Sequence, residues 1–97
     1  MQFTVRGKVW RYEGPAGWFF VSLSQRQAAQ LRATPMVAKV GWGYVPVVAR
    51  VGGSEWRTTL FPSAKDETYL IAIKATVRKR EGIAAGDTVA VDVRVLS

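Results

Sequence analysis

The stretch Thr88-Val89-Ala90-Val91-Asp92-Val93-Arg94-Val95 decides the fold class of this chain. Valine stands at every second position, and the residues between the valines are small, polar or charged. Successive side chains of a β-strand point to opposite faces of a sheet. The stretch is therefore predicted to be a strand with one buried face and one face toward solvent.

The same period of two recurs toward the N-terminus and predicts further short strands. They cover residues 69–73, 56–61, 45–51, 36–40, 18–23 and 2–12. Gly52-Gly53 fits a two-residue hairpin, and residues 62–67 read as a loop. Gly7 stands on the apolar phase of the first strand, where a missing side chain permits a bend. Pro46 cannot donate a hydrogen bond to a neighbouring strand, so its strand is expected at a sheet edge or bulge. If two copies of the chain associate, this strand is the candidate edge through which they would pair.

Two short helices interrupt the strands. Ser24 followed by Gln27 fits a capping box, and Pro35 ends this first helix. A second helix is expected at 75–81, with Gly82 as its left-handed cap. About seven short strands at this spacing predict an all-β (mainly β) chain. We expect a single domain, 1–97, built as a small closed or partly open barrel of six to seven strands, because closure removes exposed sheet edges.

Composition narrows the function classes. The chain has 14 Lys and Arg against 7 Asp and Glu, a net charge of +7 that attracts anionic partners. It has no cysteine and no histidine, which excludes disulfides and thiolate metal sites and removes the commonest general base. No metal-ligand spacing or phosphate-binding glycine loop is present. We therefore expect no cofactor, no metal and no catalytic residue, and an enzyme is not favoured. No apolar run reaches the ~18 residues of a membrane span, so we predict a cytoplasmic protein without a membrane partner.

Two groups of residues could bind a ligand. The first is basic: Lys74, Arg78, Lys79 and Arg80 lie within seven residues, and arginine grips carboxylates and phosphates with paired hydrogen bonds. The same residues also suit a solvated helix whose late positive charges complement its dipole. The second group is aromatic. Trp10 and Tyr12 share the polar phase of the first strand with Arg6 and Lys8, and three more tryptophans follow: Trp18, Trp42 and Trp56.

Several motifs resemble one family over nearly the whole chain. They are Trp18-Phe19-Phe20-Val21, Trp42-Gly43-Tyr44-Val45-Pro46-Val47, Gly52-Gly53-Ser54-Glu55-Trp56-Arg57-Thr58-Thr59-Leu60-Phe61-Pro62, Tyr69-Leu70-Ile71, Lys74-Ala75-Thr76-Val77-Arg78-Lys79 and Gly86-Asp87-Thr88-Val89. With them the chain resembles the bacterial family called domain of unknown function 1905. The resemblance implies a small β-barrel without an established activity, in relatives sometimes fused to a helical segment linked by name to bacteriocin protection. Ser24 departs from it, because the family often has proline there.

The leading prediction is a binding module without catalysis, with a pocket at one barrel end for a small anionic or aromatic ligand. Its residues are Trp18, Trp42, Trp56, Thr58, Lys74, Arg78 and Lys79. The alternative is a nucleic-acid-binding barrel with a basic and aromatic face. Its residues are Arg6, Lys8, Trp10, Lys74, Arg78, Lys79 and Arg80. A protein-interaction module and an enzyme of unknown reaction stay open as lesser alternatives, and we expect a monomer or a small homo-oligomer.

Overall fold

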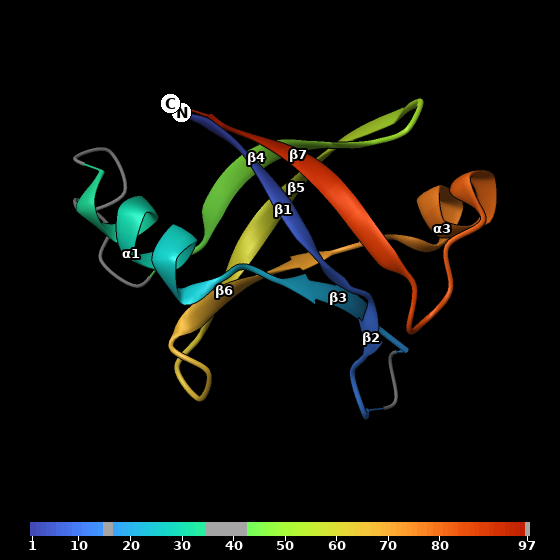
Figure 1. Cartoon of the computed structure of the whole chain (residues 1–97), viewed down its shortest axis with the longest axis horizontal. Helices are drawn as coiled ribbons and strands as arrows, with labels where there is room; N and C mark the ends of the chain where they lie inside the picture. Colours follow the sequence, from blue (N-terminus) through green and yellow to red (C-terminus); the bar gives the residue numbers. More distant parts are fainter. Residues whose placement is uncertain (15–16, 35–42, 97) are drawn as a thin grey trace.

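The computed structural model describes residues 1–14, 17–34 and 43–96. Within these ranges the chain forms one seven-stranded antiparallel sheet and two helices (Figure 1). The strands are β1 (Gln2–Lys8), β2 (Trp10–Arg11), β3 (Phe19–Ser22), β4 (Val45–Val51), β5 (Ser54–Ser63), β6 (Thr68–Ala72) and β7 (Thr88–Val95). The helices are α1 (Gln25–Ala33) and α3 (Ala75–Glu81). The strand order is β1-β7-β4-β5-β6-β3-β2. The mainly β prediction is confirmed, and the predicted strand at 36–40 lies outside the described residues.

The sheet nearly closes into a barrel because its two end strands are neighbouring pieces of chain. β1 pairs with β7, whereas β2, two residues further along, pairs with β3. The change of partner falls at Val9, directly after the bend predicted at Gly7. A Cβ on Gly7 would lie 3.3 Å from Cγ1 of Val21, so glycine lets β1 approach β3 closely. The predicted small barrel is therefore confirmed, in a partly open form.

The core is built from the inward phases of the strands. On β7, Val91, Val93 and Val95 are buried as predicted, and Val89 is partly buried near the strand's start. Figure 1 shows α1 and α3 on opposite sides of the barrel. Leu31 of α1 and Val77 of α3 are buried in the same core cluster as the strands.

The predicted capping box of α1 is present. The Gln27 amide nitrogen donates to Oγ of Ser24 over 3.1 Å, and the Ser24 amide nitrogen donates to Oε1 of Gln27 over 3.3 Å. Nε2 of Gln27 also donates to the carbonyl oxygen of Thr4 over 2.7 Å, which ties the helix to β1. Neither described helix is long and apolar enough to cross a membrane.

The prediction that Pro46 lies at an edge or bulge is wrong. β4 is an interior strand, paired with β5 on one side and β7 on the other, so it offers no edge to a second copy. The Pro46 carbonyl accepts a hydrogen bond from the Leu96 amide over 3.0 Å, so its ring nitrogen also faces β7. The β4–β7 ladder begins at Val47, so Pro46 lies just beyond its end. Because proline has no N–H, only one hydrogen bond is lost there. β5 is also longer than predicted, because Pro62 and Ser63 pair with β6.

Candidate functional site: an aromatic groove on the outer wall

Aromatic side chains gather on the outer face of β2, β3, β6 and β5. Val21 and Ile71 are paired, buried residues that point inward. Their neighbours in the strands point outward, because side chains alternate between the two faces. This places Phe20 on the outer wall, beside Trp10 of β2, which is its partner in the ladder. Phe61 of β5 pairs with Leu70, and Leu70 points outward because it is next to the inward Ile71. Phe61 therefore lies on the same wall.

Phe20 is the centre of this ring cluster. Its centroid lies 5.3 Å from that of Trp10 and 6.2 Å from that of Tyr12. Trp18 stacks on Phe20 with centroids 6.0 Å apart and planes at 6°. Phe61 stands edge-on to both Trp18 and Phe20, at 86° and 85°. Stacked and edge-to-face pairs are the arrangements that aromatic rings prefer, so the cluster holds its own shape.

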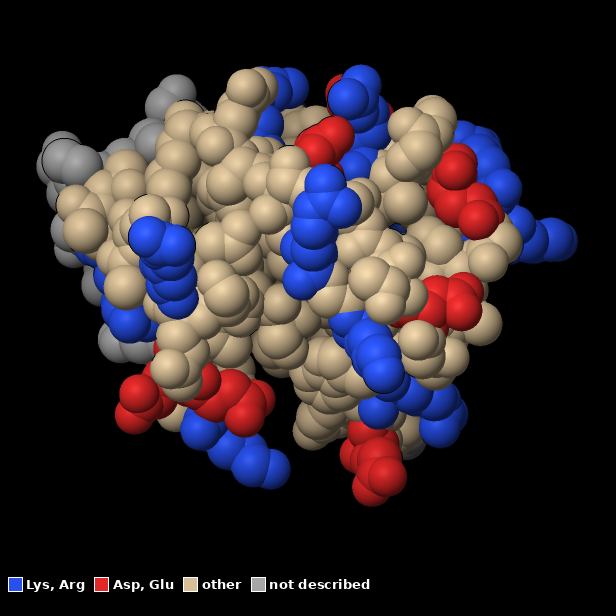
Figure 2. Space-filling model, in the orientation of Figure 1, with Lys and Arg blue, Asp and Glu red and all other residues tan. Residues whose placement is uncertain are grey.

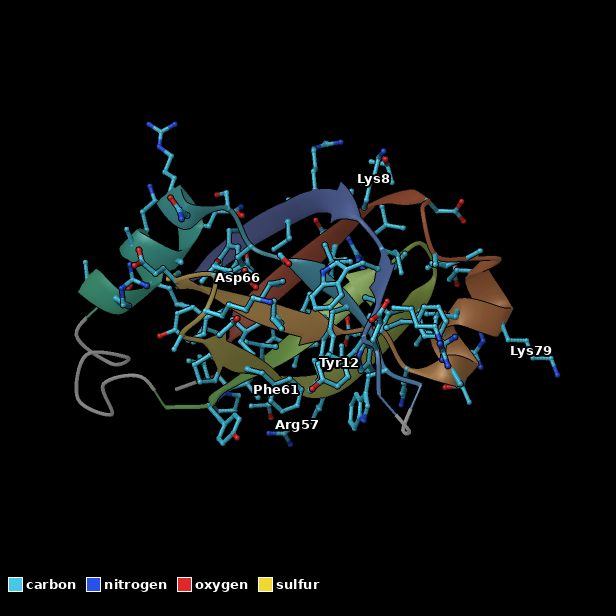
Figure 3. All side chains as sticks on the ribbon, turned by 90° about the horizontal axis from the view of Figure 1, so that it is seen from below. Lys8, Tyr12, Arg57, Phe61, Asp66 and Lys79 are labelled. Carbon is cyan, nitrogen blue, oxygen red and sulfur yellow. The ribbon has the colours of Figure 1, made fainter. Side chains whose placement is uncertain are left out.

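The cluster borders a groove of about 710 Å³ between the β2–β3 connection and the β5–β6 connection. Tyr12 and Trp18 keep 50% and 45% of their surface exposed there, whereas Phe20 is buried beneath them. Figure 3 shows Tyr12 and Phe61 on the same side of the molecule. The volume lies within the range of small-molecule sites, about 300–1,000 Å³. The groove is lined by Trp10, Arg11, Tyr12, Glu13, Trp18, Phe20, Phe61, Ser63, Lys65, Asp66 and Leu70.

Polar groups hold the walls of the groove and set its charge. Nε1 of Trp10 donates to Oγ of Ser22 over 3.0 Å, which fixes the orientation of the indole. Oγ of Ser63 donates to Oδ2 of Asp66 over 3.2 Å. The lining contains two cations and two anions, so its charge is balanced: Arg11, Lys65, Glu13 and Asp66.

A second hollow, on the outer face of β1, β7, β4 and β5, is polar and satisfied by its own residues. Asp92 accepts from Oγ1 of Thr4 over 2.8 Å and forms an ion pair with Arg50 over 3.3 Å. The hydrogen bond from Thr4 and then that from Arg50 lower the pKa of Asp92. Thr4, Arg50 and Asp92 are thus bonded to one another, and the described lining of the hollow contains no ring cluster, so the aromatic groove is the stronger candidate.

The predicted tryptophans lie in different environments. Trp18 lines the groove, and Trp42 lies outside the described residues. Trp56 is 6% exposed and belongs to the core, where it pairs in the ladder with Ala49. Thr58 pairs with the buried Val47 on the same inward phase. The structure therefore does not gather Trp18, Trp56 and Thr58 around one pocket, and the groove lies on the wall of the barrel.

The predicted basic residues fall in two separate places, with Arg6 and Lys8 on β1 and the others, Lys74, Arg78, Lys79 and Arg80, at α3. Figure 2 shows Lys and Arg at several separate places on the face in view, with Asp and Glu between them. In Figure 3, Lys8 lies on the side of the barrel opposite Tyr12 and Phe61, and Lys79 lies at the end that carries α3. Arg6, Lys74 and Arg80 are exposed. Their roles in binding stay predictions.

Arg78 has a structural role whatever it binds. Its Nε donates to the carbonyl oxygen of Ile73 over 3.1 Å, and its guanidinium carbon lies 3.7 Å from the ring centroid of Phe19. The last turn of α3 carries Arg78, Lys79 and Arg80, whose charges complement the helix dipole.

Sequence reasoning did not single out Phe20, Phe61 or Arg11. A signal was present, since residues 18–21 are apolar on both phases, and a strand of that kind needs cover on both faces. The identity of the covering rings was not readable, because Phe61 comes from a distant strand. Among the described residues, no three acidic side chains gather in a way that could hold a metal ion.

Fold and site together define a small, nearly closed antiparallel β-barrel domain with an aromatic groove on its outer wall. Residues 6–93 match the family described as Domain of unknown function (DUF1905), and the chain belongs to that family. The match confirms the resemblance drawn from the motifs. No curated protein gives a significant match to the chain.

Proposed function

We propose that this domain is a binding module whose groove holds a small, planar aromatic ligand. The observation that carries the proposal is the exposure of Trp18 and Tyr12, at 45% and 50%, on the rim of a concave, ring-lined surface. Clustered exposed rings of this kind commonly mark binding sites on soluble domains. The barrel core lies on the other face of the sheet, so the exposed parts of these rings are not needed to fill it.

The ring geometry suits a planar ligand. A ligand stacked on the exposed surface of Trp18 would lie nearly perpendicular to Phe61, because those two rings meet at 86°. Its stacked contact with Trp18 would be worth about 0.5–1.5 kcal/mol beyond the area that it buries. The hydrogen-bonding groups of Ser63 and Asp66 lie on the rim, where they can meet polar substituents.

Single-stranded nucleic acid is the second candidate. The net charge of +7 and the outward rings of a β-sheet favour it, because single-strand platforms combine stacking with phosphate contacts. The lining of the groove favours the small ligand, since its cations are matched by Glu13 and Asp66. Lys8, moreover, lies on the opposite side of the barrel from the rings (Figure 3).

Tryptophan side chains provide the test. The ¹H–¹⁵N spectrum of the protein contains one indole signal from each of its four tryptophans. Indole, adenine and 1-naphthylmethanol are each titrated to millimolar concentration, with cyclohexanol as a non-planar control. We expect at least one planar compound to shift the Trp18 and Trp10 signals while the buried Trp56 signal stays in place. Absence of any shift, or equal shifts with cyclohexanol, would refute the proposal.

An oligonucleotide titration separates the two candidates. A fluorescein-labelled dT₁₅ is titrated with the protein at about 20 and 200 mM salt, because phosphate contacts make affinity fall steeply with salt. The small-ligand proposal expects weak, salt-sensitive binding that leaves the Trp18 indole signal unshifted. Tight binding that shifts this signal would favour the nucleic-acid candidate instead.

A further inference from the structure

We infer that the aromatic ligand of the groove is a zwitterion, an aromatic α-amino acid, whose charged groups are held by Arg11 and Glu13. We call these two side chains, both in the groove lining, the head-group pair. The inference rests on the proposed function, because it names the chemistry of the ligand bound in the same groove.

The groove lining presents both signs of charge and uses neither within the protein. It holds two cations and two anions: Arg11, Lys65, Glu13 and Asp66. Within the described residues the ion pair found joins Arg50 to Asp92, so none of the four lining charges pairs with another. A ligand with a single charge would be attracted by one sign and repelled by the other. A ligand with one positive and one negative group can pair with both signs at once.

Arg11 and Glu13 are the lining charges available on the wall formed by β2 and the β2–β3 connection. Both are exposed, and within the described residues neither forms a side-chain hydrogen bond or an ion pair. Asp66, on the β5–β6 connection, already accepts from Oγ of Ser63 over 3.2 Å. Lys65 follows the same connection on the opposite wall.

Arg11 reaches the groove round the edge of the sheet. It pairs with Phe19, which has the phase of the inward Val21. β2 is the end strand of the sheet, however, and no described strand pairs with its outer edge. Nη2 of Arg11 lies 3.9 Å from the position that a Cβ on Gly17 would occupy, so the guanidinium turns toward the β2–β3 connection that borders the groove.

The spacing of the head-group pair suits an α-amino acid, whose ammonium and carboxylate groups share one carbon atom. Arg11 and Glu13 are two positions apart, so their α-carbons are at most about 7 Å apart. Their side chains are long enough to converge on a head group placed between them. Arg11 offers a fork of N–H donors to the carboxylate, and the Glu13 carboxylate accepts from the ammonium.

The backbone places the head-group pair beside the stacking ring. Tyr12 lies between the two charged residues, and its amide donates to the Trp18 carbonyl over 2.8 Å. Trp18 is therefore directly across from the centre of the pair. A ligand ring stacked on the exposed surface of Trp18 would extend its head group toward Arg11 and Glu13.

Four indoles that differ mainly in charge test the inference: tryptophan, tryptamine, indole-3-propionate and neutral tryptophol. Their affinities are measured on the whole chain from the Trp18 and Trp10 indole signals, at neutral pH and about 20 mM salt, where surface charges are little screened. We expect tryptophan to bind about fivefold or more tightly than tryptophol, as two exposed ion pairs allow. Tryptamine and indole-3-propionate should each stay within about twofold of tryptophol, because each meets one attractive and one repulsive side chain.

Substitutions of the head-group pair should move the charged ligands in opposite directions. Arg11→Gln should weaken tryptophan binding about threefold and strengthen tryptamine binding about threefold, because the repulsion of the ammonium is removed. Glu13→Gln should weaken tryptophan binding by a similar factor and strengthen indole-3-propionate instead. A merely structural role of either residue would weaken all four indoles together.

Two variants on the β5–β6 connection are the controls. Lys65→Gln removes a positive charge from the opposite wall of the groove, and Glu67→Gln removes a negative charge from the same connection outside the groove lining. Each should change the four affinities less than about twofold.

The outcomes separate this inference from the proposed function. If tryptophan binds no more tightly than the other three indoles, or if Lys65→Gln weakens it as much as Arg11→Gln, the head-group pair is overturned and the aromatic groove stands. If tryptophol and indole do not bind but glycine shifts the Tyr12 and Glu13 amide signals, the proposed function fails and the head-group pair survives. If neither the indoles nor glycine binds, both fail.

Discussion

Replacing Trp18 with alanine should weaken the binding of a planar aromatic ligand about thirtyfold and leave the barrel folded. Trp18 exposes 45% of its surface, about 110 Å² if a whole tryptophan presents about 250 Å². A stacked ligand that covers half of this area and buries an equal area of its own removes about 110 Å² from water. At about 25 cal/mol per Å² that contact is worth about 2.8 kcal/mol. Phe20 lies behind Trp18 and would replace part of this contact in the variant. We therefore expect the binding free energy to weaken by about 2 kcal/mol.

The assay is a titration of the Trp18→Ala variant with the best planar ligand, followed by the remaining Trp10 indole signal. Tyr44→Ala is the matched control, because Tyr44 is 65% exposed and contacts Phe61 at 5.5 Å between centroids, yet does not line the groove. The affinity of Tyr44→Ala for the planar ligand should change less than about twofold. Thermal unfolding of both variants checks the fold, and Trp18→Ala should lose about 1–2 kcal/mol of stability with its two ring contacts.

Trp18 is not the stacking surface if Trp18→Ala remains folded and binds the ligand as tightly as the natural chain. Its stacking role is equally refuted if Tyr44→Ala weakens binding as much as Trp18→Ala. The first result would remove the stacking surface from the site, and the second would show that loss of any exposed ring has the same effect.

Three further predictions concern stability. Burial, partly opposed by the charge of Arg32, raises the pKa of Tyr69 above 10.0, so the folded state keeps a proton that the unfolded state releases. The contribution of Tyr69 to the free energy of unfolding should therefore be fully present below pH 10.0. Above pH 10.0 it should fall by at most about 1.4 kcal/mol per pH unit. In urea titrations, the free energy of unfolding of Tyr69→Phe should lack this pH-dependent loss. Gly52→Ala should lower the free energy of unfolding by about 2–3 kcal/mol, because Gly52 has φ +56° and a Cβ there would collide with the Glu81 carboxylate. Gly53→Ala is the control, because a Cβ on Gly53 meets open space, and it should lower the free energy of unfolding by less than about 1 kcal/mol in the same denaturation assay. Leu31→Ala should lower the free energy of unfolding, measured by calorimetry, by about 2–5 kcal/mol, because Leu31 is fully buried. A smaller loss would mean that α1 does not seal the core.

Local chemistry made part of the fold predictable. Alternation marked the inward residues of β7 because a strand directs successive side chains to opposite faces whatever its partners are. The cap of α1 was readable for a similar reason, since Ser24 and Gln27 satisfy each other's backbone donors within one turn. Gly82 likewise adopts the left-handed conformation, φ 65°, that ends α3.

The candidate site was less predictable, because it depends on which strands become neighbours. Trp18 was identified as a binding residue from its type alone, and it lines the groove. Trp56 was identified in the same way, and it fills the core. Residue type cannot separate the two, since tryptophan suits both a core and a binding surface, and the deciding property is the phase of each ring relative to its neighbours in the sheet.

What the sequence determined by itself was therefore the strands, their buried faces, the helix ends and the mainly β class, all of which follow from spacings of a few residues. Tertiary structure alone decided that β4 is an interior strand and that Phe61 reaches Trp18 and Phe20. The physical reason is that a period of two gives the face on which a side chain lies but not the strand next to it. That neighbour is fixed when the sheet curls and β1 and β2 take different partners, which brings together residues far apart in the chain.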